Sequence, residues 1–186
     1  MLFHGARLSA RMDDHGGAVL LEDQDRASWD RSLIGVANTW LSRSRDVHPT
    51  RFHLEAAIAQ QHCLAPSVSE TNWPLIVQLY ERLLSLRPGP IYTLNRAIAK
   101  GQAGDCDDAL ADIGKLRRDG QLSDYSLLDC AAARLHELRG DEARARECYE
   151  SALRCTLAAH ERILIEQKLK ALGKIRSLIS YAHDFL

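Results

Sequence analysis

Residues 140–153, which read GDEARARECYESAL, carry the pattern that decides the fold of this chain. A glycine, Gly140, opens the stretch, small residues follow at Ala145 and Ala152, and the bulky Tyr149 stands between them. A glycine permits the tight turn between two antiparallel helices, because it adopts backbone conformations that other residues avoid. An alanine lets two helices cross closely, and a bulky neighbour fills the groove beside the crossing. The stretch therefore predicts a helix that packs closely against its neighbour.

The same pattern occurs 36 residues earlier in the chain. The matched pairs are Gly104 with Gly140, Asp105 with Asp141, Ala109 with Ala145, Ile113 with Tyr149, and Leu116 with Ala152. This separation is close to the period of about 34 residues that is typical of tetratricopeptide repeats. We therefore predict an all-α protein, an antiparallel helix-pair stack that forms a tetratricopeptide-like superhelix of about 9–10 helices. A generic helical bundle with chance spacing of glycine and alanine is the alternative.

The rest of the chain also favours helices, because apolar residues recur at intervals of three and four. A helix that starts among the acids of residues 22–30 would bury the stripe Trp29, Leu33, Ile34, Ala37, Trp40 and Leu41. A second helix over residues 51–63 would place Phe52 on one side together with Ala56, Ala59 and Cys63. A third would carry Trp73 to Leu84 after a weak capping box at residues 67–70, and a fourth would carry Ile91 to Ile98.

Two end-covering helices, over residues 157–172 and 177–186, would hide the last apolar face of the stack. No segment alternates β-branched and polar residues, so a sheet is not expected. The 186 residues favour one continuous domain, with an N-terminal helical part at 1–66 and the tetratricopeptide-like pairs and capping helices at 67–186.

Composition and charge exclude several classes of function. The formal net charge is -1 and basic residues alternate with acids, so we expect no direct binding of nucleic acid. No apolar stretch approaches the roughly 18 residues of a membrane span, and the first residues lack a signal-peptide pattern. A cytoplasmic location is expected. The five cysteines are odd in number and lack CxxC spacing, so neither a disulfide framework nor a zinc site is indicated.

Catalytic motifs are missing from the sequence. It contains no HExxH, GxSxG, GxGxxG or phosphate-binding GxxxxGK[ST] pattern, and His160-Glu161 lacks the second histidine of a zinc site. The acids at 23, 25 and 30 lack the ligand spacing and the glycine of a calcium loop. We therefore predict no catalytic residue, no metal and no cofactor, and we do not expect an enzyme.

A helical groove is the most plausible place for a ligand. Asn95 and Arg96 in the fourth helix, near Gln60 in the second, are polar residues among apolar ones. A guanidinium in such a groove suits a partner's carboxylate. The alternative is that these side chains pair with acids and helix ends of the same chain.

Residues 19–31, VLLEDQDRASWDR, follow an opening MLFHGAR. They resemble the C-terminal extension of a subfamily of extracytoplasmic-function RNA polymerase sigma factors, in which "LLEDQDRxxWD" follows a helix that ends in "LMLxHxAR". The resemblance covers nearly the whole chain. Further matches, in order, are LEAAIA at 54–59, TNW at 71–73, LY at 79–80, LNRA at 94–97, YSLL at 125–128, RG at 139–140, AL at 152–153 and ER at 161–162.

The chain departs from this family pattern at several positions. Asn72 stands where the family commonly has Asp, and the family commonly has a His and an Arg near the positions of Asp129 and Ala132. Ala158-Ala159 stands where an Asn-Pro is common. The basic, promoter-reading module of such sigma factors is absent from this sequence, so the chain would be either part of a longer protein or a free-standing relative.

The resemblance implies a regulatory role in transcription initiation, without catalysis. The implied partners are RNA polymerase or the sigma factor's own DNA-binding module. The expected contact residues are Glu22, Asp23, Gln24, Asp25, Arg26, Trp29 and Asp30. The alternative for these residues is structural, with Trp29 in the core and the acids capping a helix. Two other functions stay open: a free-standing scaffold that binds a peptide, and a sensor that holds a small molecule between helices.

Overall fold

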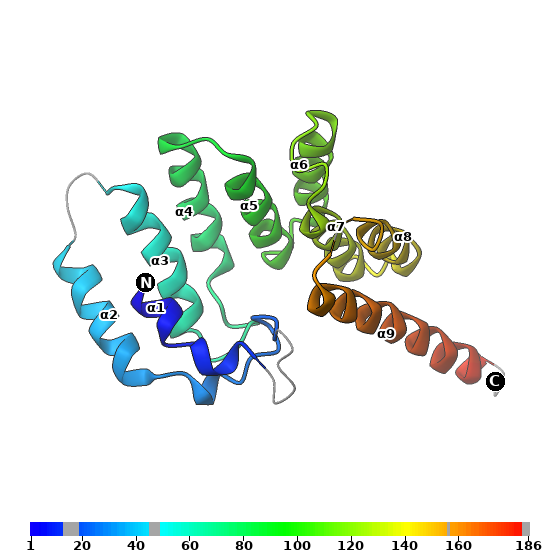
Figure 1. The fold of residues 1–186 in the computed structure, drawn as a ribbon, viewed down its shortest axis with the longest axis horizontal. Coiled ribbons are helices and arrows are strands. Elements are labelled where there is room, and N and C mark those ends of the chain that lie inside the picture. Colours follow the sequence, from blue (N-terminus) through cyan, green and yellow to red (C-terminus); the bar gives the residue numbers. More distant parts are fainter. Residues whose placement is uncertain (13–18, 45–48, 156, 184–186) are drawn as a thin grey trace. The chain divides into compact units, whose positions relative to one another are not determined.

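The computed structural model describes residues 1–12, 19–44, 49–155 and 157–183, with side chains as far as residue 172 (Figure 1). Over these residues the chain is helical, with nine α-helices, two short 3-10 helices and no β-strand. The prediction of an all-α protein is confirmed.

The chain divides into two compact units, Met1–Ala103 and Gly104–Leu186. The first unit contains α1 (Leu2–Gly5), η1 (Leu8–Ala10), η2 (Arg26–Ser28), α2 (Arg31–Arg43), α3 (Arg51–Leu64), α4 (Trp73–Leu86) and α5 (Pro90–Gln102). The second contains α6 (Cys106–Arg118), α7 (Ser126–Leu138), α8 (Glu142–Ala152) and α9 (Ala159–His183). The division expected near residue 66 lies between α3 and α4, inside the first unit.

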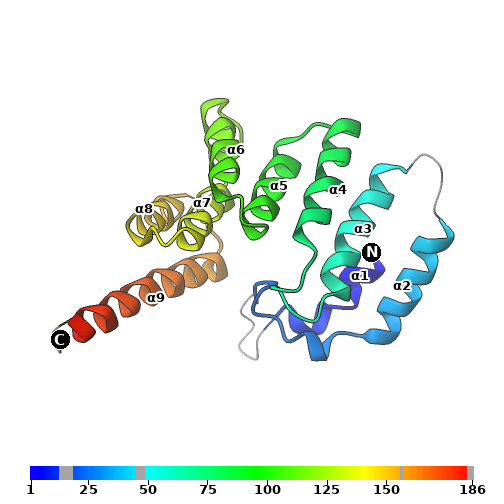
Figure 2. The same cartoon turned by 180° about the vertical axis from the view of Figure 1, so that it is seen from behind.

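Within each unit, helices that follow each other in the sequence lie side by side. In the first unit α2 packs against α3, α3 against α4 and α4 against α5, while α1 contacts both α2 and α3 (Figures 1 and 2). In the second unit α6 packs on α7, α7 on α8 and α8 on α9. This sequential packing is the arrangement that the predicted helix stack requires.

The repeated glycines lie at turns, as the sequence predicts. Gly140 follows α7 with φ +74°, and Gly104 has φ +103°. The N–H of Asp141 donates to the carbonyl of His136, and the N–H of Gly140 donates to that of Glu137, both at 2.9 Å. These two bonds satisfy carbonyls at the end of α7 that have no partner within the helix.

The matched side chains of the two repeats are also equivalent in burial. Their exposed fractions are between 0% and 4% at the six positions Ala109, Ile113, Leu116, Ala145, Tyr149 and Ala152. The three matched residues of α6 and the three of α8 therefore form the buried side of their helices. A chance spacing of glycine and alanine would not place all six in the core.

We expect Gly140→Ala to destabilise the second unit by about 1 kcal/mol, because an L-residue is strained at this positive φ. An added Cβ would meet no atom within 4 Å, so the cost is that of the backbone alone. Gly35→Ala in α2 is the matched control, since its Cβ would also meet nothing and its site is helical. Urea unfolding should show the first variant destabilised and the second equal to or more stable than the parent. Equal effects of the two substitutions would contradict this account.

The helix expected among the acids begins later than predicted. The Asp25 side chain caps η2, and α2 begins only at Arg31, where the Asp30 carboxylate accepts the N–H of Leu33 at 2.8 Å. Trp29 has extended backbone and precedes the helix. The correction has a local cause, because the cap residue of a helix is itself extended.

Trp40 and Phe52 were expected on buried stripes, and both are exposed; for Trp40 the exposed fraction is 62%. At 3.6 residues per turn, Trp40 lies about 120° around α2 from the buried Ile34, whereas Leu41 lies within about 20° of it. Leu41 is accordingly half-buried. Phe52 lies in the first turn of α3, beneath the guanidinium of Arg51. Periodicity identifies the buried face of a helix, but not how wide or how long the contact on that face is.

Two further expectations are corrected. Asn72 caps α4 by accepting the N–H of Leu75 at 3.1 Å, whereas Ser67 donates to the Glu70 carboxylate in the turn before it. The two helices expected at the end of the chain are one helix, α9. Residues 184–186 lie outside the described residues.

Candidate functional site

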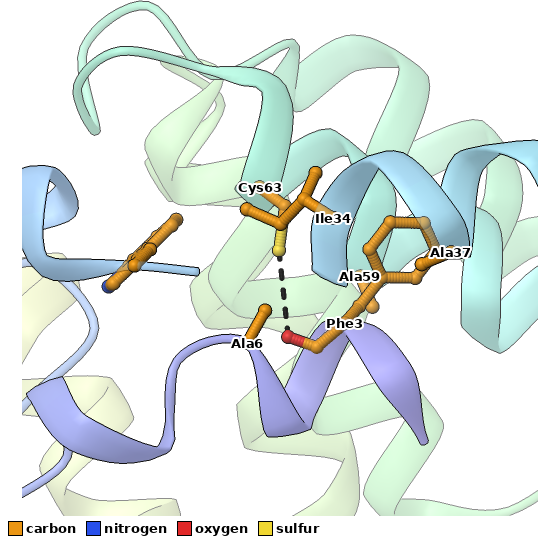
Figure 3. Close-up of a cluster of buried hydrophobic side chains, with 7 residues drawn as sticks. Phe3, Ala6, Ile34, Ala37, Ala59 and Cys63 are labelled. Atoms are coloured by element: carbon orange, nitrogen blue, oxygen red, sulfur yellow. Dashed lines mark hydrogen bonds between the residues drawn. The ribbon is translucent and has the colours of Figure 1, made fainter. Parts of the chain in front are cut away.

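The stretch at 19–31 joins the first three helices of the chain around one buried cluster. Its Trp29 is 2% exposed and belongs to this cluster. Figure 3 shows the six other members, which converge from α1, α2 and α3: Phe3, Ala6, Ile34, Ala37, Ala59 and Cys63. The Cys63 thiol donates to the carbonyl of Phe3, and the N–H of Asp30 donates to that of Ala6 at 2.9 Å.

Arg26 connects the stretch at 19–31 to the C-terminal end of α3 through hydrogen bonds. Its Nη1 donates to the carbonyl of His62 at 2.7 Å and to that of Ala65 at 2.8 Å. The last carbonyls of a helix carry partial negative charge, so a guanidinium is a favourable partner for them. The same guanidinium lies over the ring of Trp29, 4.9 Å from its centroid.

A second arginine, Arg7, also places its guanidinium over the ring of Trp29. Arg7 follows α1, and its guanidinium carbon lies 5.5 Å from the centroid of the Trp29 ring. The exposed fractions are 7% for Arg7 and 8% for Arg26. Within the described parts of the chain, neither guanidinium has a carboxylate at ion-pair distance. Two cations therefore lie close together and out of solvent, and no carboxylate of the described residues is paired with either.

Several polar atoms of this region are enclosed and make no hydrogen bond. They are Arg7 Nε, Gln24 Oε1, Arg26 Nη2, Trp29 Nε1 and His62 Nδ1. Buried polar atoms are nearly always paired in proteins, so such a group in one place requires an explanation. We call Arg7, Gln24, Arg26, Trp29 and His62 the arginine cluster.

The charges of Arg7 and Arg26 act on two nearby titratable groups, His62 and Cys63. Burial, together with the charges of Arg7 and Arg26, lowers the pKa of His62 to about 4. Burial also raises the pKa of the Cys63 thiol, despite the nearby arginines. Near neutral pH the histidine and the thiol are therefore uncharged, and the two guanidinium groups carry the charge.

We expect the first unit to lose stability as the pH falls from 6.5 towards 4. The unfolded chain binds a proton at His62 near pH 6.5, while the folded chain resists protonation until about pH 4. The stabilising contribution is therefore complete above pH 6.5 and declines below it. Urea midpoints at pH 7.5 and 4.5 should differ less in His62→Gln than in the parent. An equal difference in both proteins would assign the loss to other groups.

The four acidic residues of the stretch at 19–31 that were expected to contact a partner differ in their surroundings. The carboxylates of Asp25 and Asp30 cap η2 and α2. Asp23 is exposed and Glu22 is half-buried. Of the seven motif residues expected to contact a partner, Gln24, Arg26 and Trp29 are buried within this chain. The amide of Gln24 donates to the carbonyl of Val19 at 3.1 Å.

The polar residues expected in a helical groove make local contacts. Gln60 Nε2 donates to Asn38 Oδ1 of α2 at 2.8 Å. Asn95 is hydrogen-bonded to the hydroxyl of Tyr80 in α4, and Arg96 also has a partner. The contact of Gln60 joins α3 to α2, and that of Asn95 joins α5 to α4.

Sequence reasoning missed a pocket in the second unit. It has a volume of ≈ 480 Å³, and its walls include Arg117, Leu122, Tyr125, Leu128, Asp129 and Cys148. Arg117 and Asp129 form an ion pair, and Leu122 has φ +62°, which is unusual for a leucine. No spacing in the sequence marks these residues, because they come from α6, α7, α8 and the loop between α6 and α7.

The side chains that the structure describes contain no group of three or more His, Cys, Asp or Glu that could hold a metal ion. Among the same residues, no helix is long and apolar enough to cross a membrane.

Comparison with known proteins gives two matches. Residues 1–45 match a family of unknown function, DUF6596. An uncharacterized protein of Rhizobium meliloti (strain 1021) is 34% identical over 174 residues, which are 93% of this chain and 41% of the relative. The chain thus spans about two fifths of the length of the curated relative that it matches. No solved structure matches the chain.

The residues that match the family contain most of the arginine cluster of the first unit. Residues 1–45 include Arg7, Arg26 and Trp29, together with α1 and α2. The part of the chain that is similar to DUF6596 therefore supplies four of the five residues of the arginine cluster, all except His62.

Proposed function

We propose that this chain is the C-terminal regulatory and interaction domain of a sigma factor. It acts in transcription initiation through protein–protein contacts, with RNA polymerase or with the sigma factor's own DNA-binding module. The observation that carries the proposal is the stretch at 19–31, on which the resemblance to sigma-factor extensions rests. Asp25 and Asp30 cap helices, Arg26 holds the end of α3, and Trp29 fills the core. The residues that carry the resemblance are therefore also residues that stabilise the first unit of this chain.

Charge and size support a role through protein contacts. The formal net charge of -1 does not favour a phosphate backbone as the partner. The matched relative is longer than this chain, which spans 41% of it. A further module in such a longer protein is consistent with the proposal.

The solvent-facing side of α2 offers a surface for such a contact. Val36 and Trp40 lie one turn apart, and both are exposed. A large exposed aromatic residue next to an aliphatic one is typical of the residues that dominate binding energy in protein interfaces. We propose that this side of α2 contacts the partner.

The test of the proposed function is affinity purification of the protein, tagged in its own gene, from growing cells. The β and β′ subunits of RNA polymerase should co-purify, and loss of the gene should change transcription from a defined set of promoters. The purified 186-residue chain should not shift promoter DNA in a gel. Purification without polymerase subunits, together with an unchanged transcriptome, would refute the proposal.

We expect Trp40→Lys to leave the free energy of unfolding within about 0.5 kcal/mol of the parent, because the side chain is exposed. The same variant should recover several-fold less polymerase in the purification. Leu86→Lys, at an exposed position on α4, is the matched control and should recover the parent amount. Equal recovery by both variants would remove α2 from the interface.

A second candidate function is a small-molecule sensor, which the pocket in the second unit favours. Its volume of ≈ 480 Å³ falls within the range of about 300–1,000 Å³ of ligand pockets. A thermal-shift screen of metabolites should find a stabilising compound whose effect disappears in Leu128→Trp, which fills the pocket. A screen without such a compound would count against this function.

A further inference from the structure

The arginine cluster contains two positive charges, and no carboxylate of the described residues is paired with either of them. A guanidinium stays protonated at every physiological pH, so burial cannot neutralise it. A buried charge without a partner is strongly destabilising. Arg26 is partly compensated by the carbonyls of His62 and Ala65. Among the described residues, Arg7 contacts the ring of Trp29, which carries no charge.

The unpaired atoms of the cluster are mostly donors. Arg7 Nε, Arg26 Nη2 and Trp29 Nε1 each carry an N–H without an acceptor. The one atom that can only accept is Gln24 Oε1. Among the described residues, these two positive charges and three donor nitrogens have no acceptor that carries negative charge and several oxygens.

We infer that the arginine cluster binds a small dianion of the phosphate class, such as inorganic phosphate or a phosphate monoester. Two charges balance the two guanidinium groups, and the oxygens of a phosphate accept from several directions. A carboxylate supplies one charge and two oxygens, so it leaves part of the cluster unpaired. Guanidinium forks match phosphate oxygens with two parallel hydrogen bonds. This site lies in the first unit and does not depend on the proposed role in transcription.

The test is thermal unfolding of the purified chain, prepared without phosphate and titrated with sodium phosphate at constant ionic strength. We expect the Tm of the first unit to rise along a saturating curve, by roughly 10 °C at a hundred times the Kd. Sodium acetate at equal ionic strength should have little effect. A titration with glycerol phosphate distinguishes the source, because stronger binding than that of inorganic phosphate would assign a phosphorylated metabolite.

Arg7→Met should abolish the response to phosphate while keeping a side chain of similar length. Without phosphate this variant should unfold at the same temperature as the parent or higher, because it lacks the unpaired charge. Arg43→Met, at an exposed position near the end of α2, should keep the full response. In the parent, the ¹⁵N resonance of Arg7 Nε should shift with the same Kd, which tests the site even if the variant fails to fold.

Four results would overturn the inference. A Tm that rises linearly with phosphate would be a general salt effect on burial. An equal rise in acetate would exclude a phosphate site. A response that persists in Arg7→Met, or an unmoved Arg7 resonance at saturating phosphate, would place any binding elsewhere.

Discussion

Trp29→Ala is expected to destabilise the first unit by about 3–5 kcal/mol, which is the usual cost of replacing a buried tryptophan by alanine. The Trp29 side chain is 2% exposed, and it packs among residues of three helices. Its removal would leave a cavity between them and would take the aromatic face away from Arg7 and Arg26. The effect should therefore exceed that of any single cap in this unit.

Urea unfolding followed by far-UV circular dichroism measures this effect. Trp40→Ala is the matched control, because it removes the same side chain from an exposed position and should change stability by about 0.5 kcal/mol or less. Similar losses in the two variants would show that Trp29 does not anchor the cluster.

Tyr149→Ala is expected to cost the second unit about 3–5 kcal/mol, as other buried aromatic-to-alanine substitutions do. Tyr149 is buried with Ala133, Ala145, Ala152 and Ile165 between α7, α8 and α9. These alanines cannot expand to fill the space that the ring would vacate.

Tyr149→Phe separates the ring from the hydroxyl. The hydroxyl donates to Glu137 Oε1 at 3.1 Å, and losing this bond should cost about 1 kcal/mol. Because Tyr149 and Ile113 hold equivalent repeat positions, Ile113→Ala should also destabilise this unit. A phenylalanine variant as unstable as the alanine variant would assign the loss to the hydrogen bond.

The repeat could be predicted from the sequence because its features are local. The glycines at 104 and 140 are needed for positive φ, and the alanines at 109 and 145 for close packing. Each requirement restricts the residue type at a single position, so the two repeats show the same residue types at the same spacing in the sequence. The same reasoning failed for Trp40, because the width of a buried face depends on the neighbouring helix.

Only part of the arginine cluster could be predicted from the sequence. Arg26 and Trp29 stood out in a motif, but their sequence context favoured a partner contact and a structural role equally. Arg7 stood out only as the last residue of the opening MLFHGAR, and His62 carried no signal. They lie 19 and 36 residues from Arg26, so nothing in the sequence joined them to it. The coincidence of two arginines on one tryptophan exists only after α1, α2 and α3 have packed.

The amino-acid sequence was sufficient for the helical class, the turns at the repeated glycines and the buried side of α6 and α8. Backbone conformation and helical period govern these features, and both act over a few residues. Tertiary structure alone decided that Trp40 faces solvent and that Arg7 and Arg26 lie over the same ring, that of Trp29. Burial and charge balance depend on which distant segments meet, and that information is spread over the whole unit.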